Sequence, residues 1–131
     1  MITISGVNPD NQKMNRDMAN HISEITIEKI IERIEAEIER GSRLSVREVA
    51  LWSGYSHRHL QRLFLMYTGI PLGEYIRRRR LNRVALLLRL SQRSFQDIAL
   101  STGFDSQQSM NRDFKKNTGL TPKQYRYRKL F

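Results

Sequence analysis

The sequence contains no cysteine, and this absence excludes disulfide bonds, thiolate metal sites and a cysteine nucleophile. It also contains no apolar run that approaches the roughly 20 residues needed to cross a bilayer as a helix. The N-terminus lacks a signal-peptide pattern, because Ile2 and Ile4 are followed at once by polar residues. We therefore expect a soluble protein with a cytoplasmic location and no membrane partner.

Residues that could form a catalytic centre are scarce as well. His57 and His59 are two positions apart, which places them on different sides of a helix, and His21 is distant from both in the sequence. There is no HxxxH motif, no glycine-rich phosphate loop and no catalytic pair of carboxylates. These absences argue against an enzyme and predict no metal ion or cofactor. The length of 131 residues leaves little room for an effector domain, so we also expect no small-molecule ligand.

Charge is abundant but unevenly placed, with a formal net charge of +10. Residues 1–39 carry four Lys/Arg and eight Asp/Glu, a balance of −4, whereas residues 40–131 carry nineteen and five, a balance of +14. A field this positive attracts polyanions, of which nucleic acids and anionic membranes are the usual ones. Charge alone leaves open a basic protein that is merely soluble.

The spacing of apolar residues predicts an all-α fold of about seven helices. Residues 1–24 show no sustained period and are rich in Asn and Asp, so we expect a flexible N-terminal arm. A helix is predicted from Thr26 to near Gly41. Its apolar face carries Ile27, Ile30, Ile31, Ile34 and Ile38, and its other face carries Glu28, Glu32, Glu35 and Glu39. The acidic face should point away from any polyanion that the rest of the chain binds.

Two segments of the sequence, residues 45–75 and 94–125, repeat one pattern. Ala50 and Gly54 match Ala99 and Gly103 at a spacing of 49. At a spacing of 50, Arg62, Phe64, Thr68, Gly69 and Tyr75 match Arg112, Phe114, Thr118, Gly119 and Tyr125, so one residue is inserted in the second turn. Two short helices, each started by a serine and separated by a glycine turn, are typical of a helix-turn-helix.

The repeat divides the chain into a first helix-turn-helix subdomain over 25–70, a linker helix over 71–90 and a second subdomain over 91–131. Thr121 and Pro122 should start the last helix of the second subdomain. A linker helix from about Leu72 to Arg89 would be roughly 27 Å long. It could hold two reading helices about one DNA turn, roughly 34 Å, apart.

The second helix of each unit presents side chains suited to the edges of DNA bases, because Arg pairs with guanine and Asn or Gln with adenine. These residues are His57, Arg58, Gln61 and Arg62 in the first unit, and Gln107, Gln108, Asn111 and Arg112 in the second. Polar stripes on helices are usually solvated surface, but both of these faces lack Glu and Lys, the common surface residues. We therefore interpret them as two DNA-reading faces, which predicts an asymmetric site.

Other polar residues are suited to the phosphate backbone. They are Ser56, Arg77, Arg79, Arg80, Ser106, Lys115 and Lys116. Contacts of this kind carry no sequence information, so a non-specific or architectural nucleic-acid-binding protein is the main alternative. The paired Gln and Arg faces favour specific recognition, because a purely electrostatic binder does not need them.

The sequence from about Thr26 to Arg128 resembles the AraC/XylS family of transcription regulators, and most closely its stand-alone subgroup of MarA, SoxS and Rob type. The residues that carry the likeness are Gly54-Tyr55-Ser56, His59 to Phe64, Tyr75-Ile76-Arg77, Asp97-Ile98-Ala99, Gly103-Phe104, Ser106 to Ser109, Arg112, Phe114, Lys115, Thr121-Pro122 and Tyr125-Arg126. The resemblance implies a monomer on an asymmetric site of two major-groove turns. It also implies activation through RNA polymerase at stress and multidrug-resistance promoters.

By position, the resemblance implies base contacts from Arg58, Gln61 and Arg62, and from Gln107, Gln108 and Arg112. Arg58 departs from the family pattern, because the nearest relatives usually have Trp there. An arginine would bind guanine or a phosphate instead of a thymine methyl group. Asp113 is a second departure, because a carboxylate on a DNA-facing helix repels phosphate unless it holds an arginine.

Overall fold

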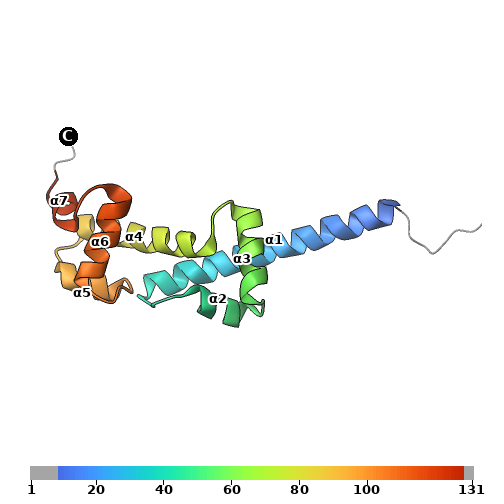
Figure 1. Ribbon diagram of the computed structural model, residues 1–131, viewed down its shortest axis with the longest axis horizontal. Helices are drawn as coiled ribbons and strands as arrows, with labels where there is room; N and C mark the ends of the chain where they lie inside the picture. The colour runs from blue at the N-terminus through green and yellow to red at the C-terminus, as the bar shows by residue number, and fades with distance from the viewer. Residues whose placement is uncertain (1–8, 129–131) are drawn as a thin grey trace, which may run out of the picture.

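The computed structural model describes residues 9–128, and in this range the chain forms seven helices and no strand (Figure 1). The helices are α1 (Pro9–Glu39), α2 (Val46–Ser53), α3 (His57–Thr68), α4 (Leu72–Leu90), α5 (Phe95–Ser101), α6 (Gln107–Thr118) and α7 (Pro122–Tyr127). The prediction of an all-α fold with about seven helices is confirmed. None of these helices has the length and apolar content to span a bilayer.

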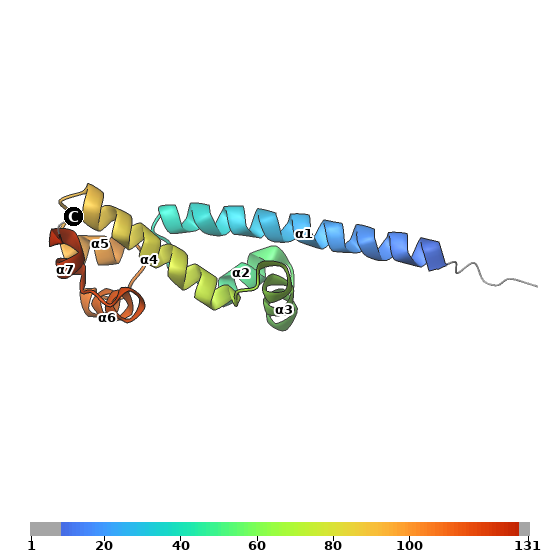
Figure 2. The same cartoon turned by 90° about the horizontal axis from the view of Figure 1, so that it is seen from above.

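Helix α1 begins at Pro9 and not near Thr26, so residues 9–24 are helical and their prediction as a loose arm is wrong. The segment contains no glycine, and its one proline occupies the first helical position, so nothing in the backbone stops the helix. Its sequence has no apolar residues at helical spacing, because the side chains described from Arg16 to Ile25 are exposed or half-buried and cover no core. Residues 1–8 of the predicted arm lie outside the described residues. Figure 2 shows α1 extending well past the other helices.

The first head consists of α1, α2, α3 and the start of α4, which enclose one apolar core. The isoleucines at helical spacing supply one wall of it: Ile27, Ile30, Ile34 and Ile38 are buried. Helix α2 starts where the Ser45 hydroxyl accepts a hydrogen bond from the Glu48 N–H at 3.2 Å. It ends at Gly54, whose φ of +81° is the left-handed geometry that a glycine adopts most easily.

The second head consists of the rest of α4 with α5, α6 and α7 around a separate core. Its buried side chains are Leu81, Val84, Leu88, Ile98, Ala99, Phe104, Met110 and Phe114. Helix α7 begins with a complete capping box, in which the Thr121 hydroxyl accepts from the Gln124 N–H and the Gln124 side chain accepts from the Thr121 N–H. Helix α4 is therefore shared between the two cores and is more than a spacer.

The two heads repeat their hydrogen bonds as well as their residues. The Thr68 hydroxyl donates to the Phe64 carbonyl at 2.7 Å, and the Thr118 hydroxyl donates to the Phe114 carbonyl at the same distance. The Phe64 ring lies 5.4 Å from that of Tyr75, and the matching rings in the second head lie 5.3 Å apart. The sequence repeat is therefore a repeat of structure.

Candidate nucleic-acid interface

In Figure 2, α3 lies beyond one end of α4 and α6 lies beside its other half, and both are on the side of the molecule opposite α1. Both helices run across the long axis of the molecule, one towards each end of α4 (Figure 1). The acidic helix α1 is thus kept away from the side that both second helices of the repeats occupy. This arrangement can present two polar faces to one long ligand.

Helix α3 is started by Ser56, whose hydroxyl accepts a hydrogen bond from the His59 N–H at 3.2 Å. Burial of Leu60, Leu63 and Phe64 fixes its rotation about its own axis. All four residues predicted to read bases from this helix are exposed: His57, Arg58, Gln61 and Arg62. The outward face of α3 thus contains no carboxylate and presents guanidinium and amide groups to solvent.

Helix α6 is started by Ser106 in the same way, with a distance of 3.1 Å from its hydroxyl to the Ser109 nitrogen. Burial of Met110 and Phe114 turns the rest of the helix outward. The four predicted reading residues differ in exposure: Gln108 and Arg112 are exposed, whereas Gln107 and Asn111 are half-buried. The Asn111 Oδ1 atom is buried and accepts no hydrogen bond from another described residue. The second face is therefore narrower than the first.

The predicted phosphate contacts fall into two groups. Lys115 and Lys116 are exposed in the last turn of α6. Arg77 pairs with Glu74 within α4 and keeps an exposed side chain. Arg79 pairs with Glu35 of α1 at 2.7 Å, and Arg80 donates to the Leu44 carbonyl at 3.1 Å. The structure thus directs Arg79 and Arg80 towards other parts of the chain.

Glu35 is a further departure from the sequence interpretation, which placed it on an outer acidic face. Its carboxylate accepts a hydrogen bond from the Tyr75 hydroxyl at 2.6 Å, in addition to the ion pair with Arg79. Burial, followed by this hydrogen bond, raises the pKa of Tyr75 to about 12. Glu35 therefore joins α1 to α4 in place of facing solvent.

Arg47 is a candidate that the sequence analysis missed. It is exposed on α2 and lines a surface hollow of about 570 Å³ together with Tyr55, Ser56 and His57, beside the start of α3. Its place inside the Ser45–Glu48 capping motif suggested a structural role only. Arg47 and Ala50 are three residues apart, so they share one side of α2, and both line the hollow. A basic residue at this spacing was the signal that could have found it.

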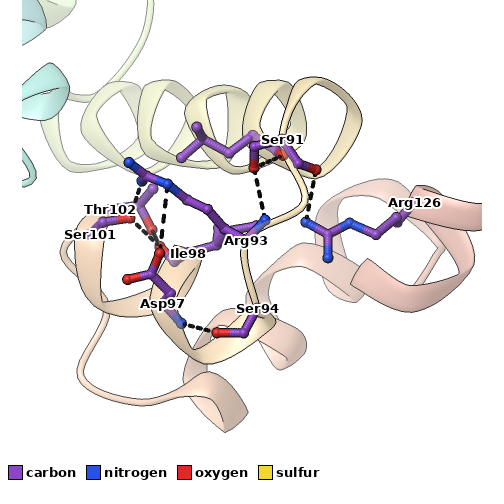
Figure 3. A network of polar contacts seen from close by, with 9 residues as sticks. Ser91, Arg93, Ser94, Asp97, Ile98, Ser101, Thr102 and Arg126 are labelled. Carbon is purple, nitrogen blue, oxygen red and sulfur yellow. Dashed lines mark hydrogen bonds and ion pairs between the residues drawn. The ribbon is translucent and has the colours of Figure 1, made fainter.

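Two arginines, Arg93 and Arg126, are used within the second head. Arg126 of α7 donates to the Leu88 carbonyl at 3.1 Å and to the Ser91 carbonyl at 3.5 Å, at the end of α4. Figure 3 shows Arg126 near Ser91, and Arg93 reaching Ser101 and Asp97. Positive charge at these carbonyls suits the negative end of the helix dipole of α4. Arg126 is thus less available to a polyanion than its charge suggests.

The outward faces of α3 and α6 form a candidate binding surface. Among the side chains that the structure describes, no three of His, Asp and Glu gather so that they could hold a metal ion. The chemistry on the α3 and α6 faces is that of hydrogen-bond donors and amides, which suits base edges.

A family model described as a helix-turn-helix domain matches residues 49–128. A regulator with an AraC-type DNA-binding domain from Chromobacterium violaceum has a similar solved structure, with a TM-score of 0.69 and 32% identity over 79% of this chain and 91% of that one. The chain belongs to the AraC/XylS family. The family model includes α3, α4 and α6, and hence both predicted reading faces.

Among the curated AraC/XylS relatives, the F1 operon positive regulatory protein of Yersinia pestis is 42% identical over 105 residues, which are 80% of this chain and 35% of that protein. The HTH-type transcriptional activator AarP of Providencia stuartii is 48% identical over 85 residues, which are 65% of this chain and 63% of AarP. The chain spans between 29% and 42% of the length of the first relatives it matches. The F1 operon protein and AarP are both named as regulators.

Proposed function

We propose that this chain is a transcription regulator that binds an asymmetric duplex DNA site as a monomer. Helices α3 and α6 enter the major groove on successive turns. One observation carries the proposal: α3 and α6, each with exposed Arg and Gln side chains, both lie on the side of the molecule opposite α1. Two reading helices in a single chain provide what most helix-turn-helix proteins obtain by forming a dimer.

The length of α4 supports the spacing of the two faces. Its 19 residues correspond to roughly 28 Å at the helical rise of about 1.5 Å per residue. This length is similar to one turn of DNA, roughly 34 Å, and the heads extend past the ends of α4. The faces differ in sequence, so the two half-sites should differ as well.

The exposed residues divide by role. Arg58, Gln61, Arg62, Gln108 and Arg112 are exposed enough to reach base edges, with His57, Gln107 and Asn111 at the margins of the two faces. Ser56 and Ser106, at the starts of α3 and α6, lie where helix N-termini attract phosphate. Arg77, Lys115, Lys116 and the newly found Arg47 complete the proposed phosphate contacts.

The regulatory role is the part that rests most on relatives. The F1 operon protein is named a positive regulator and AarP an activator. The family resemblance adds RNA polymerase as partner, and stress and multidrug-resistance promoters as targets. We propose that the chain activates such genes in the bacterial cytoplasm, on nucleoid DNA, without a small-molecule ligand.

A non-specific or architectural DNA-binding protein is the second candidate, because residues 40–131 carry a balance of +14. Selection of bound sequences from a random duplex pool at physiological salt separates the two. A specific regulator enriches one asymmetric site, which should then compete at least about 10³-fold better than random DNA. Equal competition by random DNA would reject specific recognition.

Paired arginine variants test the two reading faces on the selected site. Arg62→Ala and Arg112→Ala should each weaken binding by about 1–3 kcal/mol and relax the choice of base at one position, in different half-sites. Arg83→Ala, on α4 and outside both faces, is the matched control. A uniform loss on every sequence from all three variants would assign these arginines to phosphates.

A further inference from the structure

The two heads touch each other at a point away from the axis of α4. The loop between α1 and α2 meets the turn between α5 and α6, as Figure 1 shows at the end of α1. The loop is held from within, because the Ser42 hydroxyl and its N–H donate to Glu37 at 2.7 and 3.0 Å. The surface that the first head offers at this contact is therefore preformed.

At two glycines, the backbones of the two heads approach each other so closely that a side chain would not fit. A Cβ atom on Gly103 would lie 2.8 Å from the Ser42 carbonyl oxygen, and one on Gly41 would overlap the Ser101 carbonyl oxygen. The matching glycine of the first head, Gly54, has nothing within 4 Å of the equivalent point. Both Gly54 and Gly103 have positive φ, +81° and +90°. The repeat thus has the same turn glycine twice, but only one of them lies in a contact between the heads.

Arg80 of α4 lies inside this contact. One guanidinium nitrogen donates to the Leu44 carbonyl of the first head, and the guanidinium carbon lies 5.6 Å from the centre of the Phe104 ring in the second. The Arg80 Nε atom is buried. Burial lowers the pKa of Arg80, and the carboxylates of Asp113 and Asp105 oppose the shift. A planar cation with a hydrogen bond to one head and a ring from the other joins the two.

The residue inserted in the second turn of the repeat contributes as well. The first turn passes from Tyr55 directly to its capping serine, whereas the second has Asp105 between Phe104 and Ser106. The Asp105 carboxylate pairs with Arg43 of the first head at 2.8 Å. Both side chains are exposed, so this pair orients the contact more than it stabilises it.

We propose that this inter-head clamp, formed by residues 41–44, Arg80 and residues 101–105, sets the half-site spacing that the protein accepts. Arg80 is then a positioning residue and not a phosphate ligand, and Asp113 supports its charge. The proposal rests on the two-headed DNA binding proposed above. Without the clamp, α4 would be the main connection between the heads, and bending of α4 or a shift of either core on it could change the angle between α3 and α6. The clamp adds three contacts: the close approach of Gly103 to Ser42, the hydrogen bond from Arg80 to Leu44, and the ion pair of Arg43 with Asp105. Together they fix the angle between α3 and α6.

The glycine pair supplies a matched test. Gly103→Ala and Gly54→Ala introduce the same methyl group at the same left-handed conformation, so both lose similar local stability. Only Gly103→Ala pushes against Ser42. On a set of duplexes with zero, one or two base pairs added or removed between the half-sites, wild type and Gly54→Ala should prefer one spacing by about tenfold or more. Gly103→Ala should lose most of that preference. Equal preferences in all three would overturn the proposal.

Arg80 variants separate positioning from phosphate binding. A phosphate ligand needs charge, so Arg80→Met would weaken every spacing alike, reduce the salt slope by about 1, and be rescued by Arg80→Lys. A clamp residue needs the planar guanidinium between Leu44 and Phe104, so both variants should broaden the spacing preference and leave the salt slope unchanged. The first outcome would overturn the role of Arg80.

A distance measurement on the protein without DNA tests the clamp independently of the proposed function. Because the chain has no cysteine, Met66→Cys in α3 and Lys123→Cys in α7 give two unique spin-label sites, both exposed in wild type. The distance distribution between the labels should be narrow in wild type and Gly54→Ala. It should broaden in Gly103→Ala and in Arg80→Met, while the circular dichroism of each variant shows intact helix. Unchanged distributions in both clamp variants would overturn the proposal, whatever the DNA result.

Discussion

The two heads share one plan but differ in how each core is closed. In the first head, four isoleucines of α1 cover the helix-turn-helix from outside. In the second, the short helix α7 has that place, and two arginines add to the cover: the guanidinium carbon of Arg89 lies 4.4 Å from the centre of the Tyr125 ring, and that of Arg126 lies 4.8 Å from the centre of the Phe95 ring. The first head has one such contact, between Arg33 and Trp52 at 4.2 Å. The difference shows that a duplicated scaffold keeps its turns and core aromatics while its closure can change.

The mode of closure has a consequence for stability. Burial of apolar side chains contributes about 1.5–3 kcal/mol for each large residue, whereas a cation–π contact contributes about 0.5–1 kcal/mol when exposed and about 2 kcal/mol when desolvated, and the pairs of the second head are half-buried. The first head should therefore be the more stable of the two. The second head depends on contacts that salt and partial unfolding of α7 can weaken.

The largest expected effect comes from the matched core phenylalanines. Phe64→Ala and Phe114→Ala should each destabilise by about 3–5 kcal/mol, because both rings are fully buried. Phe114→Ala should unfold the second head at ordinary temperature, whereas Phe64→Ala should leave the first head mostly folded. Hydrogen exchange resolved by residue would measure this. Equal protection of the two damaged heads would contradict the ranking drawn from their closure.

Local signals in the sequence predicted most of the fold. Serine caps, turn glycines and the period of apolar residues predicted the short helices of both repeats, because each signal acts over one or two turns of helix. The linker helix, expected from about Leu72 to Arg89, runs from Leu72 to Leu90. The start of α1 was missed for the same reason. Residues 9–24 bury no described side chain deeply, so no apolar period marked them as helix.

Contacts between distant parts of the chain could not be read in the same way. Nothing near Arg80 in the sequence indicates that Leu44, 36 residues earlier, accepts its hydrogen bond. The sequence analysis therefore grouped Arg79 and Arg80 with the exposed Arg77 as one basic band. It also placed all four residues of each reading face outward, although Gln107 and Asn111 of α6 are half-buried. The sequence thus predicted which types of side chain form the candidate site. Which of those side chains are exposed could be learned only from the tertiary structure.

A smaller effect distinguishes the matched tyrosines. The Tyr75 hydroxyl donates to Glu35, whereas the Tyr125 hydroxyl has no hydrogen bond to another described residue. Tyr75→Phe should therefore lower the free energy of unfolding by about 1 kcal/mol, and Tyr125→Phe should change it little. Urea denaturation of both variants at pH 7 would show the difference. Equal losses would mean that the bond to Glu35 adds nothing to the first head.

The dependence of stability on pH is a second test of the hydrogen bond between Tyr75 and Glu35. The pKa of Tyr75 is raised from 10.0 to about 12, so the folded state favours the neutral phenol. The stability this contributes is fully present below pH 10 and is lost as the pH rises through about 12. Wild type and Tyr75→Phe should therefore converge in stability over this window. A gap that stays constant from pH 9 to about pH 12 would contradict the assignment of the shift.

The smallest effect concerns the ends of the two reading helices, where the heads differ in charge. At a spacing of 50, Lys115 and Lys116 of α6 correspond to Leu65 and Met66 of α3, and all four are exposed. If the heads meet DNA alike, Lys115→Leu should lower the slope of log affinity against log salt by about 0.9, and Leu65→Lys should raise it by a similar amount. Neither change should alter the selected sequence. A response to Lys115→Leu alone would mean that the end of α3 stands away from the phosphate backbone, and that the heads dock at different angles.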